Sequence, residues 1–352
     1  MLTRRKKIVA LAAGGLACAG ILALLLGVDL YLHHRAERSA GLNRWGYRGP
    51  VAPRKQPGEV RVVMLGGSTT FGYGVRSHES IPAALEASLR AREGGAKFRT
   101  INLGFNNEGA YASVPTLEDY AWLDYDIVAL YHGYNDLRGD PDVNTAVFRH
   151  TSPVFRLTGY FPILPMVLQE KAMALRSGGN LDAAYKSARD GSAPIVFTPN
   201  VAQRTSAAAL EALSNVTGAV GSQLDRMAAK VAPEQAASET GCESPWMRFC
   251  DSIYRAVAHA RARGLGVMVI AQPRGTGKNF AALDGQRRQL AAMLSRQFGG
   301  DRGTLFVDLS GAVDPSTSPL SFDAIHLNVE GNAAIARALV DPVITLARSL
   351  GK

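Results

Sequence analysis

The alternation of short apolar runs with helical patterns is the feature that most limits how this chain folds. Five runs have the length and apolar content of buried strands, and they lie at residues 59–66, 98–104, 124–133, 264–273 and 303–310. Amphipathic helical patterns follow them, including residues 80–92, which begin at a capping Ser80, and the end of the chain after Asn328. Strands that alternate with helices predict a parallel sheet covered by helices on both faces.

Residues 137–205 break this rhythm with a long apolar stretch. Pro162 and Pro165 interrupt it, so it is too broken for a second membrane span. We interpret it as an insertion in the domain, and three roles stay open for it: an extra helical layer that completes the core, a lid, or an element at a membrane surface. A further helix is expected near residues 206–230.

The N-terminus predicts a membrane anchor. Four basic residues, Arg4–Lys7, precede an uncharged run of 21 residues, Ile8–Val28, and at about 1.5 Å per residue such a run crosses a hydrocarbon core of about 30 Å. We expect residues 1–34 to form a signal-anchor transmembrane helix that leaves the remaining chain on the periplasmic side of a bacterial inner membrane. Residues 35–58, which are basic and contain prolines, are expected to link this anchor to a domain at residues 59–352.

A cleaved signal peptide and a lipidated cysteine are the alternatives to this anchor. The apolar run ends in bulky residues rather than in a small-residue cleavage pattern. Cys18 lies in a faint lipoprotein-like context, but Gly15 stands where such a signal has leucine. We therefore favour the uncleaved anchor, with a cleaved, secreted form as the alternative.

The formal net charge of +9 is concentrated at the N-terminus. Residues 1–55 carry ten basic and two acidic residues, and the rest of the chain is within one charge of neutral. A nucleic-acid-binding domain needs a basic patch on its folded part. The composition therefore argues against a nucleic-acid partner.

Two of the three cysteines, Cys242 and Cys250, lie close together in the sequence. In an oxidising compartment they are expected to form a short-loop disulfide, and two free, half-buried thiols are the alternative. Ser244 and Pro245 between them fit the N-cap and first position of a helix. A disulfide there would join the start of that helix to the preceding loop.

In the stretch "VVMLGGSTTFGYGV" (Val62–Val75), the first apolar run leads into a glycine-rich turn that carries Ser68. Tyr73 replaces the lysine of a phosphate-binding P-loop, and Ser77 replaces the third glycine of a dinucleotide fingerprint. Thr70 replaces the last glycine of the α/β-hydrolase elbow. A different nucleophile turn remains, with Ser68 at the carboxyl end of a strand, where open α/β sheets form their sites. Its glycines are interpreted as room for a substrate carbonyl.

A serine nucleophile needs a base, and His326 is the strongest candidate. It lies in "FDAIHLNVEGN", between the fifth apolar run and the last helix, with Asp323 three residues before it. In a tight loop a carboxylate can hold one ring nitrogen of a histidine while the other faces the serine. The other histidines are isolated and are interpreted as packed or solvated side chains.

Two further strand ends supply donors for an oxyanion hole. Gly104 ends the second run and offers a backbone N–H, and Asn135 follows the third run and offers a side-chain amide. Each also fits a simpler role, Gly104 as a turn glycine and Asn135 as the start of an Asx turn. Their joint placement at strand ends favours the catalytic interpretation.

The chain resembles the SGNH hydrolases, the GDSL-like lipase and esterase superfamily, in four ordered blocks: Ser68, Gly104, Gly133–Asp136 and Asp323–His326. The resemblance covers residues 59–349. The G-x-N-D and D-x-x-H blocks match fully. The first block departs, because Gly67 stands where the named pattern has aspartate and Thr69 where it has leucine.

This resemblance implies a flavodoxin-like three-layer α/β/α sandwich with a five-stranded parallel sheet. It implies Ser68 as nucleophile, His326 as base and Asp323 as the partner of that base. The implied oxyanion hole consists of the Ser68 N–H, the Gly104 N–H and the Asn135 side chain. The implied reaction is acyl transfer to water through an acyl-serine, with no metal and no organic cofactor.

The predicted function is a serine esterase or deacylase that acts on an acyl ester of a cell-envelope carbohydrate or lipid. The same residues also fit an O-acyltransferase that acts on envelope polysaccharide. A catalytically silent carbohydrate- or lipid-binding module is the alternative from another class. Four aromatic residues near strand ends fit either a substrate pocket or core packing: Phe71, Tyr73, Tyr111 and Tyr134.

Overall fold

The computed structural model describes residues 4–92, 97–137, 147, 149, 152–176, 240–275, 278–316 and 319–352. The chain forms two compact units. The first consists of Met1–Arg38 and Arg149–Ala232, and the second of Ser39–Phe148 and Pro233–Lys352. All of the candidate catalytic residues belong to the second unit, which therefore carries the site.

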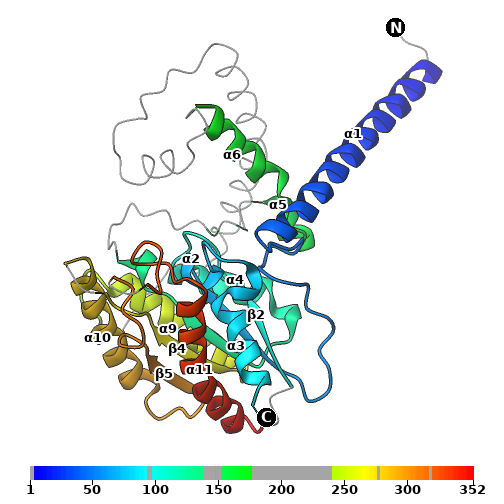
Figure 1. Cartoon of the computed structure of the whole chain (residues 1–352). Coiled ribbons are helices and arrows are strands. Elements are labelled where there is room, and N and C mark those ends of the chain that lie inside the picture. The colour runs from blue at the N-terminus through cyan, green and yellow to red at the C-terminus, as the bar shows by residue number, and fades with distance from the viewer. Residues whose placement is uncertain are drawn as a thin grey trace. The chain divides into compact units, whose positions relative to one another are not determined.

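The second unit is built on a parallel sheet (Figure 1). Its described strands are β1 (Val60–Gly66), β2 (Phe98–Asn102), β3 (Ile127–Tyr131), β4 (Gly266–Ala271) and β5 (Thr304–Asp308). The strand order is β2-β1-β3-β4-β5, and each neighbouring pair is parallel. This is the order of flavodoxin-like folds, so the predicted five-stranded parallel sheet is confirmed.

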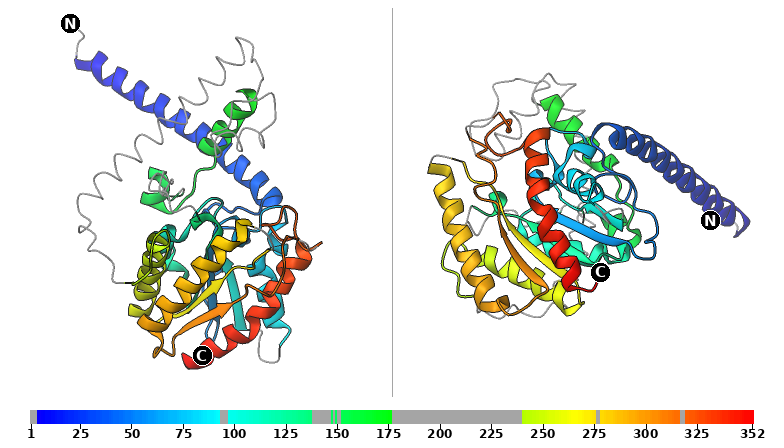
Figure 2. Two further views of the ribbon diagram at one scale, coloured as in Figure 1. Left: turned by 90° about the vertical axis from the view of Figure 1, so that its left-hand side faces the viewer. Right: turned by 60° about the horizontal axis from the view of Figure 1, so that its bottom comes forward.

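Helices cover both faces of the sheet, as the views in Figure 2 show. On one face α3 (Ile81–Arg90) packs against α11 (Val329–Ser349). The other face carries α4 (Ser113–Asp119), α9 (Met247–Ala262) and α10 (Lys278–Phe298). The result is the predicted three-layer sandwich. Short 3-10 helices lie at Ser77–Glu79 (η1), Ala110–Ala112 (η3), Ala121–Leu123 (η4) and Tyr134–Asp136 (η5).

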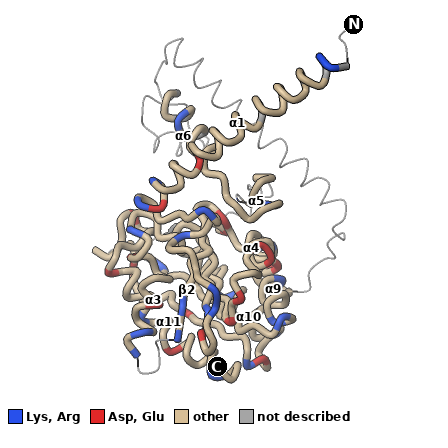
Figure 3. Tube along the Cα trace, turned by 90° about the vertical axis from the view of Figure 1, so that its right-hand side faces the viewer, with Lys and Arg blue, Asp and Glu red and all other residues tan. Residues whose placement is uncertain are grey.

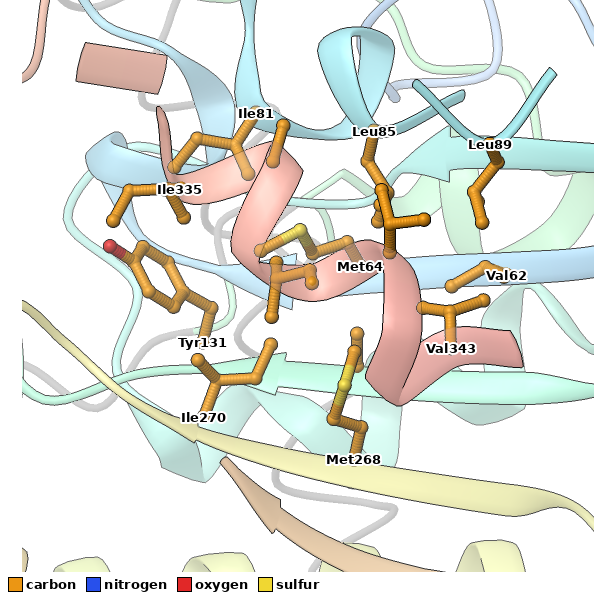
Figure 4. Close-up of a cluster of buried hydrophobic side chains, with 14 of the residues drawn as sticks. Val62, Met64, Ile81, Leu85, Leu89, Tyr131, Met268, Ile270, Ile335 and Val343 are labelled. Carbon is orange, nitrogen blue, oxygen red and sulfur yellow. The ribbon is translucent and has the colours of Figure 1, made fainter. Parts of the chain in front are cut away.

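The core explains why the strands read as continuous apolar runs. Side chains alternate between the two faces of a strand. In β1, Val62 and Met64 pack with the side chains of α3 and α11 (Figure 4). Val63 and Leu65 alternate with them and are equally buried. Because helices cover both faces, neither set of side chains is polar.

The sequence predicted a linker over residues 35–58, but part of this range is folded into the second unit. Residues 39–52, here called the post-anchor segment, belong to the folded second unit. Tyr47 is buried, and Arg48 forms an isolated antiparallel bridge with Asn102 at the end of β2. The basic composition of the segment concealed this packing, because its buried cation is satisfied by backbone groups rather than by acidic partners.

The first unit contains α1 (Arg4–Ser39), α5 (Pro153–Thr158) and α6 (Leu164–Arg176). Asp29 on α1 accepts a hydrogen bond from the Tyr160 hydroxyl and another, at 2.7 Å, from the N–H of Leu164. One turn later, the Nε2 atom of His33 lies 2.5 Å from the carbonyl oxygen of Phe161. Part of the insertion is therefore helical and packs on α1.

The remainder of the insertion lies outside the described residues. The described residues leave out 138–146, 148, 150–151 and 177–239, so the helix expected near residues 206–230, beyond the insertion, also lies outside them. From Leu11 to Ser39, α1 is long and apolar enough to cross a membrane, by length and composition. A signal sequence has the same features.

Two helix starts test the capping signals of the sequence. Asn328 caps α11, because its Oδ1 accepts the N–H of Gly331 at 3.0 Å. Ser80 occupies the N-cap position of α3, but its hydroxyl donates to the carbonyl of Ser77 instead of capping the helix. The position of each start is therefore as expected, while only Asn328 caps through its side chain.

The start of α9 differs from the expectation. Ser244 and Pro245 lie in a turn, closed by the N–H of Trp246 on the carbonyl of Glu243 at 2.8 Å, and α9 begins only at Met247. A disulfide joins Cys242 to Cys250, which lies in the first turn of α9. The bonded pair is as predicted, whereas the capping role of Ser244 is wrong because the turn delays the helix.

Charged residues of both signs are spread over the second unit (Figure 3). At the amino ends of the strands several of them form ion pairs. These are Arg61–Glu59 at 2.7 Å, Lys55–Asp126 at 2.8 Å and Lys352–Asp126 at 3.1 Å. The pairing agrees with the near-neutral composition of this part of the chain.

Candidate active site

Ser68 begins α2 (Ser68–Phe71), a single helical turn directly after β1. Two glycines allow this sharp junction. A Cβ on Gly66 would lie 2.0 Å from Oγ1 of Thr70, and a Cβ on Gly67 would lie 2.2 Å from Nδ2 of Asn135. The glycines therefore make room for the α2 turn and for the Asn135 amide, rather than for a substrate carbonyl as the sequence suggested.

His326 and Asp323 lie with Ser68 in one hydrogen-bonded series. Nε2 of His326 is 2.8 Å from Oγ of Ser68, and Nδ1 is 2.7 Å from Oδ2 of Asp323. A carboxylate only accepts hydrogen bonds, so Nδ1 carries the proton. The neutral ring then presents the lone pair of Nε2 to the serine hydroxyl. This is the arrangement in which a histidine can take the serine proton.

The loop that holds this pair is a closed turn between β5 and α11. The N–H of Phe322 donates to the carbonyl of His326 at 2.9 Å, and Oδ1 of Asp323 accepts the N–H of His326 at 2.8 Å. Ala324 has a φ of 67°, in the left-handed region. This backbone turns the chain so that the Asp323 carboxylate faces both the backbone and the ring of His326.

The charge state of Asp323 suits this role. Partial burial raises the pKa of its carboxyl, but hydrogen bonds from the backbone and side chain of His326 outweigh burial and hold the pKa below its ordinary value. At neutral pH the carboxylate is therefore ionised. An ionised partner stabilises the imidazolium that forms when His326 takes a proton.

Asn135 lies on η5, directly after β3, and its amide reaches residues 66–75, here called the serine turn. Its Nδ2 donates to the carbonyl of Glu108 at 2.8 Å. An amide nitrogen has two protons, so the second is available to a ligand beside Ser68. Nine residues line a cavity of about 10 Å³ at this point, room for one water-sized group: Gly67, Ser68, Thr69, Glu108, His132, Gly133, Tyr134, Asn135 and Gln272.

Gly104 is not brought to the site in the way the sequence predicted. Its N–H donates to Oδ1 of Asn102 at 3.0 Å. A Cβ at this position would lie 2.7 Å from the backbone nitrogen of Phe71 and 2.7 Å from Cβ of Thr70. The glycine is therefore required for close packing against α2, and its N–H is not aimed at an oxyanion.

Gln272 is a site residue that the sequence analysis missed. Its Nε2 donates to Oγ1 of Thr69 at 2.9 Å, and its Oε1 accepts the N–H of Tyr134 at 2.8 Å. The side chain thus joins the serine turn to the turn that carries Asn135. The signal was present, because Gln272 lies at the end of the fourth apolar run and so at a carboxyl strand end like the other site residues.

Two buried ionisable groups, His132 and Asp136, lie close to Asn135 in the sequence. Burial lowers the pKa of His132 to about 3, so the ring is neutral and contacts Oγ of Ser113 at 3.1 Å. Burial raises the pKa of Asp136 to about 7, although backbone hydrogen bonds from Ala110 and Gly133 partly offset it. Neither group contacts Ser68. Both help to fix the loops on either side of Asn135.

The four aromatic residues separate into two groups. Tyr73 lies with its ring centroid 4.9 Å from that of His326, and it is 49% exposed. Tyr134 donates its hydroxyl to the carbonyl of Pro273 at 2.5 Å and is a packing residue. Burial raises the pKa of Tyr111 to about 12, and Phe71 packs under a guanidinium. Among these four, Tyr73 is therefore the exposed ring that contacts His326, while Tyr134 lines the cavity beside Ser68.

Within the described ranges, no three His, Cys, Asp or Glu side chains lie close enough together to hold a metal ion. The polar groups at the carboxyl strand ends are instead a hydroxyl, an imidazole, a carboxylate and two amides. Such a set can transfer protons and bind a developing oxyanion.

No family model and no curated protein match the chain. The chain is, however, similar in structure to several solved proteins. LAE5, an α/β hydrolase from the metagenome of Lake Arreo in Spain, is 16% identical, with 82% of this chain and 96% of that one covered and a TM-score of 0.43. The acetyl xylan esterase AlAXEase is 12% identical, with 81% and 100% covered and a TM-score of 0.44. A member of the lipolytic protein G-D-S-L family from Veillonella parvula is 10% identical, with 80% and 97% covered and a TM-score of 0.42. At these values the likenesses carry no argument about activity, which depends on the residues of this chain.

Proposed function

We propose that this protein is an SGNH-type serine esterase that hydrolyses an acyl ester through an acyl-serine intermediate. The observation that carries the proposal is the series of two hydrogen bonds from Asp323 through His326 to Ser68, at 2.7 and 2.8 Å. The series ends beside the Asn135 amide, and it joins residues that lie 258 positions apart in the sequence. Structural roles alone would not require this order of acceptor, base and hydroxyl.

In the first half of the proposed reaction, Oγ of Ser68 attacks the ester carbonyl while Nε2 of His326 takes the hydroxyl proton. The carbonyl oxygen becomes an oxyanion, which the free proton of Asn135 Nδ2 and the N–H of Ser68 stabilise. The C–O bond of the ester then breaks, and His326 returns its proton to the departing alcohol. Ser68 keeps the acyl group.

In the second half, water replaces the alcohol. His326 takes a proton from the water, whose oxygen attacks the acyl-serine carbonyl. The bond to Oγ breaks, His326 returns the proton to Ser68, and the carboxylic acid leaves. The Gly104 N–H is bonded to Asn102. The oxyanion is therefore assigned to the Asn135 amide and the Ser68 N–H in both halves of the reaction.

The site supports a small acyl group on a bulky alcohol. The cavity beside Ser68 has room for one water-sized group, which suits an acetyl methyl. On the side of His326, Tyr73 and Phe322 are about half exposed, and the Asp323 side chain is 48% exposed. An open aromatic rim of this kind can contact a sugar ring, so an acylated envelope carbohydrate is the proposed substrate class.

The proposed location is outside the cytoplasm, with α1 as the membrane anchor. The disulfide between Cys242 and Cys250 supports an oxidising compartment. The basic residues Arg4–Lys7 before the apolar part of α1 support the orientation with the N-terminus inside. Protease treatment of spheroplasts, which should digest the second unit, tests this orientation.

The test of the proposed function is labelling of the detergent-solubilised full chain with a fluorophosphonate, followed by peptide mapping. The label is expected on Ser68, and acetate is expected to be released from an acetylated polysaccharide. Acetate that appears on an acceptor polysaccharide instead of in solution would indicate the O-acyltransferase. Absence of both label and acyl transfer would contradict the proposal and favour a binding module.

A further inference from the structure

Arg48 is a buried arginine whose side chain lies on the backbone of the serine turn. It belongs to the post-anchor segment and is 4% exposed. Burial lowers its pKa to about 10, so the guanidinium remains charged at neutral pH. A buried charge destabilises the folded state unless polar partners surround it. The partners of Arg48 therefore reveal what the residue does.

Among the described residues, the side-chain hydrogen bonds of Arg48 all go to backbone carbonyls. Nε donates to Ala40 at 2.8 Å. Nη1 donates to Phe71 and, at 2.5 Å, to Gly72, and Nη2 donates to Val75 at 2.5 Å. The guanidinium carbon also lies 4.4 Å from the centroid of the Phe71 ring. One planar cation thus joins the post-anchor segment to three carbonyls of the serine turn, those of Phe71, Gly72 and Val75.

These carbonyls are the ones that α2 cannot satisfy by itself. The last carbonyls of any helix lack partners within the helix, and an isolated single turn is not stable. In α2 the N–H groups of Gly72 and Tyr73 both return to the carbonyl of Ser68, at 2.9 and 3.0 Å. The carbonyl of Phe71 is left for Arg48 and for the Asn102 amide, which lies at 3.2 Å. The carbonyl of Gly72 accepts from Arg48 and from the N–H of Val75 at 3.3 Å.

The position of the nucleophile depends on this end of the turn. The backbone carbonyl of Ser68 accepts the N–H groups of Gly72 and Tyr73. Arg48 bonds the carbonyl of Gly72, so it holds the same part of the backbone. A shift of the Phe71–Val75 backbone therefore moves Ser68 relative to His326, whose loop belongs to a different part of the chain. An error of about 1 Å in such a pair can cost on the order of 100-fold in rate.

We infer that Arg48 is a positioning residue that holds the α2 turn so that Oγ of Ser68 faces Nε2 of His326. The inference rests on the proposed function, because it assigns Arg48 a role in the reactivity of that serine. It also gives the post-anchor segment a part in catalysis, as the segment supplies the cation. Lysine cannot replace the guanidinium, because an ammonium has three N–H donors on a single nitrogen and cannot bond all four of these carbonyls.

Arg61 provides a matched control at the opposite end of β1. It is 2% exposed, and its guanidinium also donates to backbone carbonyls, those of Leu123 at 2.7 Å and Pro53 at 2.5 Å. It additionally bonds Glu59 at 2.7 Å. It lies near the amino end of β1, whereas Ser68 follows the carboxyl end of this strand. Arg48→Lys and Arg61→Lys therefore remove comparable buried forks, and only the first removes one from the serine turn.

The experiment uses the full chain in detergent and measures three quantities for each variant: the rate constant of fluorophosphonate labelling at Ser68, kcat and KM for a soluble acetyl ester, and the midpoint of thermal unfolding. For Arg48→Lys we expect labelling and kcat to fall by about 10-fold or more, with KM little changed. For Arg61→Lys we expect the midpoint of thermal unfolding to fall by about as much as in Arg48→Lys. The rate constant of labelling should stay within about 2-fold of the wild type.

Phe71→Leu keeps the carbonyls and removes the ring under the guanidinium, so it tests the inference if Arg48→Lys does not fold. It is expected to slow labelling by a smaller factor, about 3-fold, and to leave KM unchanged. Labelling of a folded Arg48→Lys or Phe71→Leu protein at the wild-type rate would overturn the inference and leave the proposed function intact. Equal slowing by Arg61→Lys would also overturn it. Absence of label on wild-type Ser68 would overturn the proposed function itself.

Discussion

The two ends of the parallel strands use similar polar residues in different ways. At the amino ends, opposite charges pair with each other, as in Lys55 with Asp126 and Arg61 with Glu59. At the carboxyl ends, directed hydrogen bonds hold the Ser68 hydroxyl at Nε2 of His326 and the Asn135 amide at the carbonyl of Glu108. The difference indicates that neutralised charge stabilises one end, while directed hydrogen bonds prepare the other for chemistry.

The largest expected effect comes from removing the nucleophile or its base. Ser68→Ala or His326→Ala should reduce kcat/KM by about 10⁴-fold or more, because acyl transfer then loses its attacking group or proton acceptor. The matched change at the amino ends, Asp126→Asn, should leave kcat/KM within about 2-fold of the wild type. Steady-state assays beside thermal unfolding check the pair, and the contrast between the two ends fails if Asp126→Asn is as inactive as Ser68→Ala.

A smaller effect is expected from the oxyanion donor. Asn135→Ala should lower kcat by on the order of 10²–10³-fold, since one of two assigned donors is lost in the transition state. KM should change little, because the donor acts on charge that develops after binding. A variant that raises KM at constant kcat would show instead that Asn135 holds the ground-state substrate.

Gln272→Ala should have a modest effect on both activity and stability. It leaves the N–H of Tyr134 without its partner, at about 1–3 kcal/mol for an unsatisfied buried donor, and it frees the serine turn from the Asn135 turn. We expect kcat to fall by about 10-fold. The exposed Gln56 at the amino ends is the control, and Gln56→Ala should alter neither measurement. Unchanged kcat in a folded Gln272→Ala protein would remove this residue from the site.

The smallest effect concerns the dependence of the free energy of unfolding on pH. Its slope should have opposite signs for a carboxyl at the carboxyl ends of the strands and one at the amino ends. The pKa of Asp136 is raised from 3.8 to about 7 by burial, so the folded state binds this proton more tightly. The free energy of unfolding therefore falls as pH rises between these two values. Asp136→Asn should flatten this slope and add on the order of 1–3 kcal/mol at pH 8, less than the full linkage value because a buried site relaxes.

Asp126 provides the opposite case at the amino ends. Burial raises the pKa of its carboxyl, but hydrogen bonds from Lys55, the Arg61 backbone and Lys352 outweigh burial and lower it overall. Its contribution to stability is therefore present above its ordinary pKa and is lost as pH falls through the folded value. Asp126→Asn should destabilise the protein at neutral pH. Denaturant unfolding over a pH series measures both slopes, and slopes of the same sign would contradict the comparison.

The sequence predicted the sheet because strands buried on both faces leave continuous apolar runs, as in Val60–Gly66. It predicted that Ser68, Asn135, Asp323 and His326 lie at one end of the sheet, because each follows a strand and parallel strands end together. The contact between Asp323 and His326 could also be predicted, because only two residues separate them in a tight loop.

The misplaced and missed residues depend on backbone directions that composition does not carry. Whether the Gly104 N–H points to Ser68 or to Asn102 is decided by the turn after β2, and a glycine allows both. Arg48 was hidden because a basic residue near an anchor usually lies in solvent, whereas here it is buried on carbonyls. Ser244 failed as a cap because the chain turns before α9 begins.

The central claim is that His326 activates Ser68, and the most direct measurement is the rate of fluorophosphonate labelling at Ser68 in the wild type and in His326→Ala. The full chain is used in both cases, and mass spectrometry locates the label. We expect a single label on Ser68 of the wild type and a rate lower by about 10³-fold or more in the variant, with unchanged thermal unfolding. Equal labelling rates in the two proteins, or a label on another residue, would contradict the account.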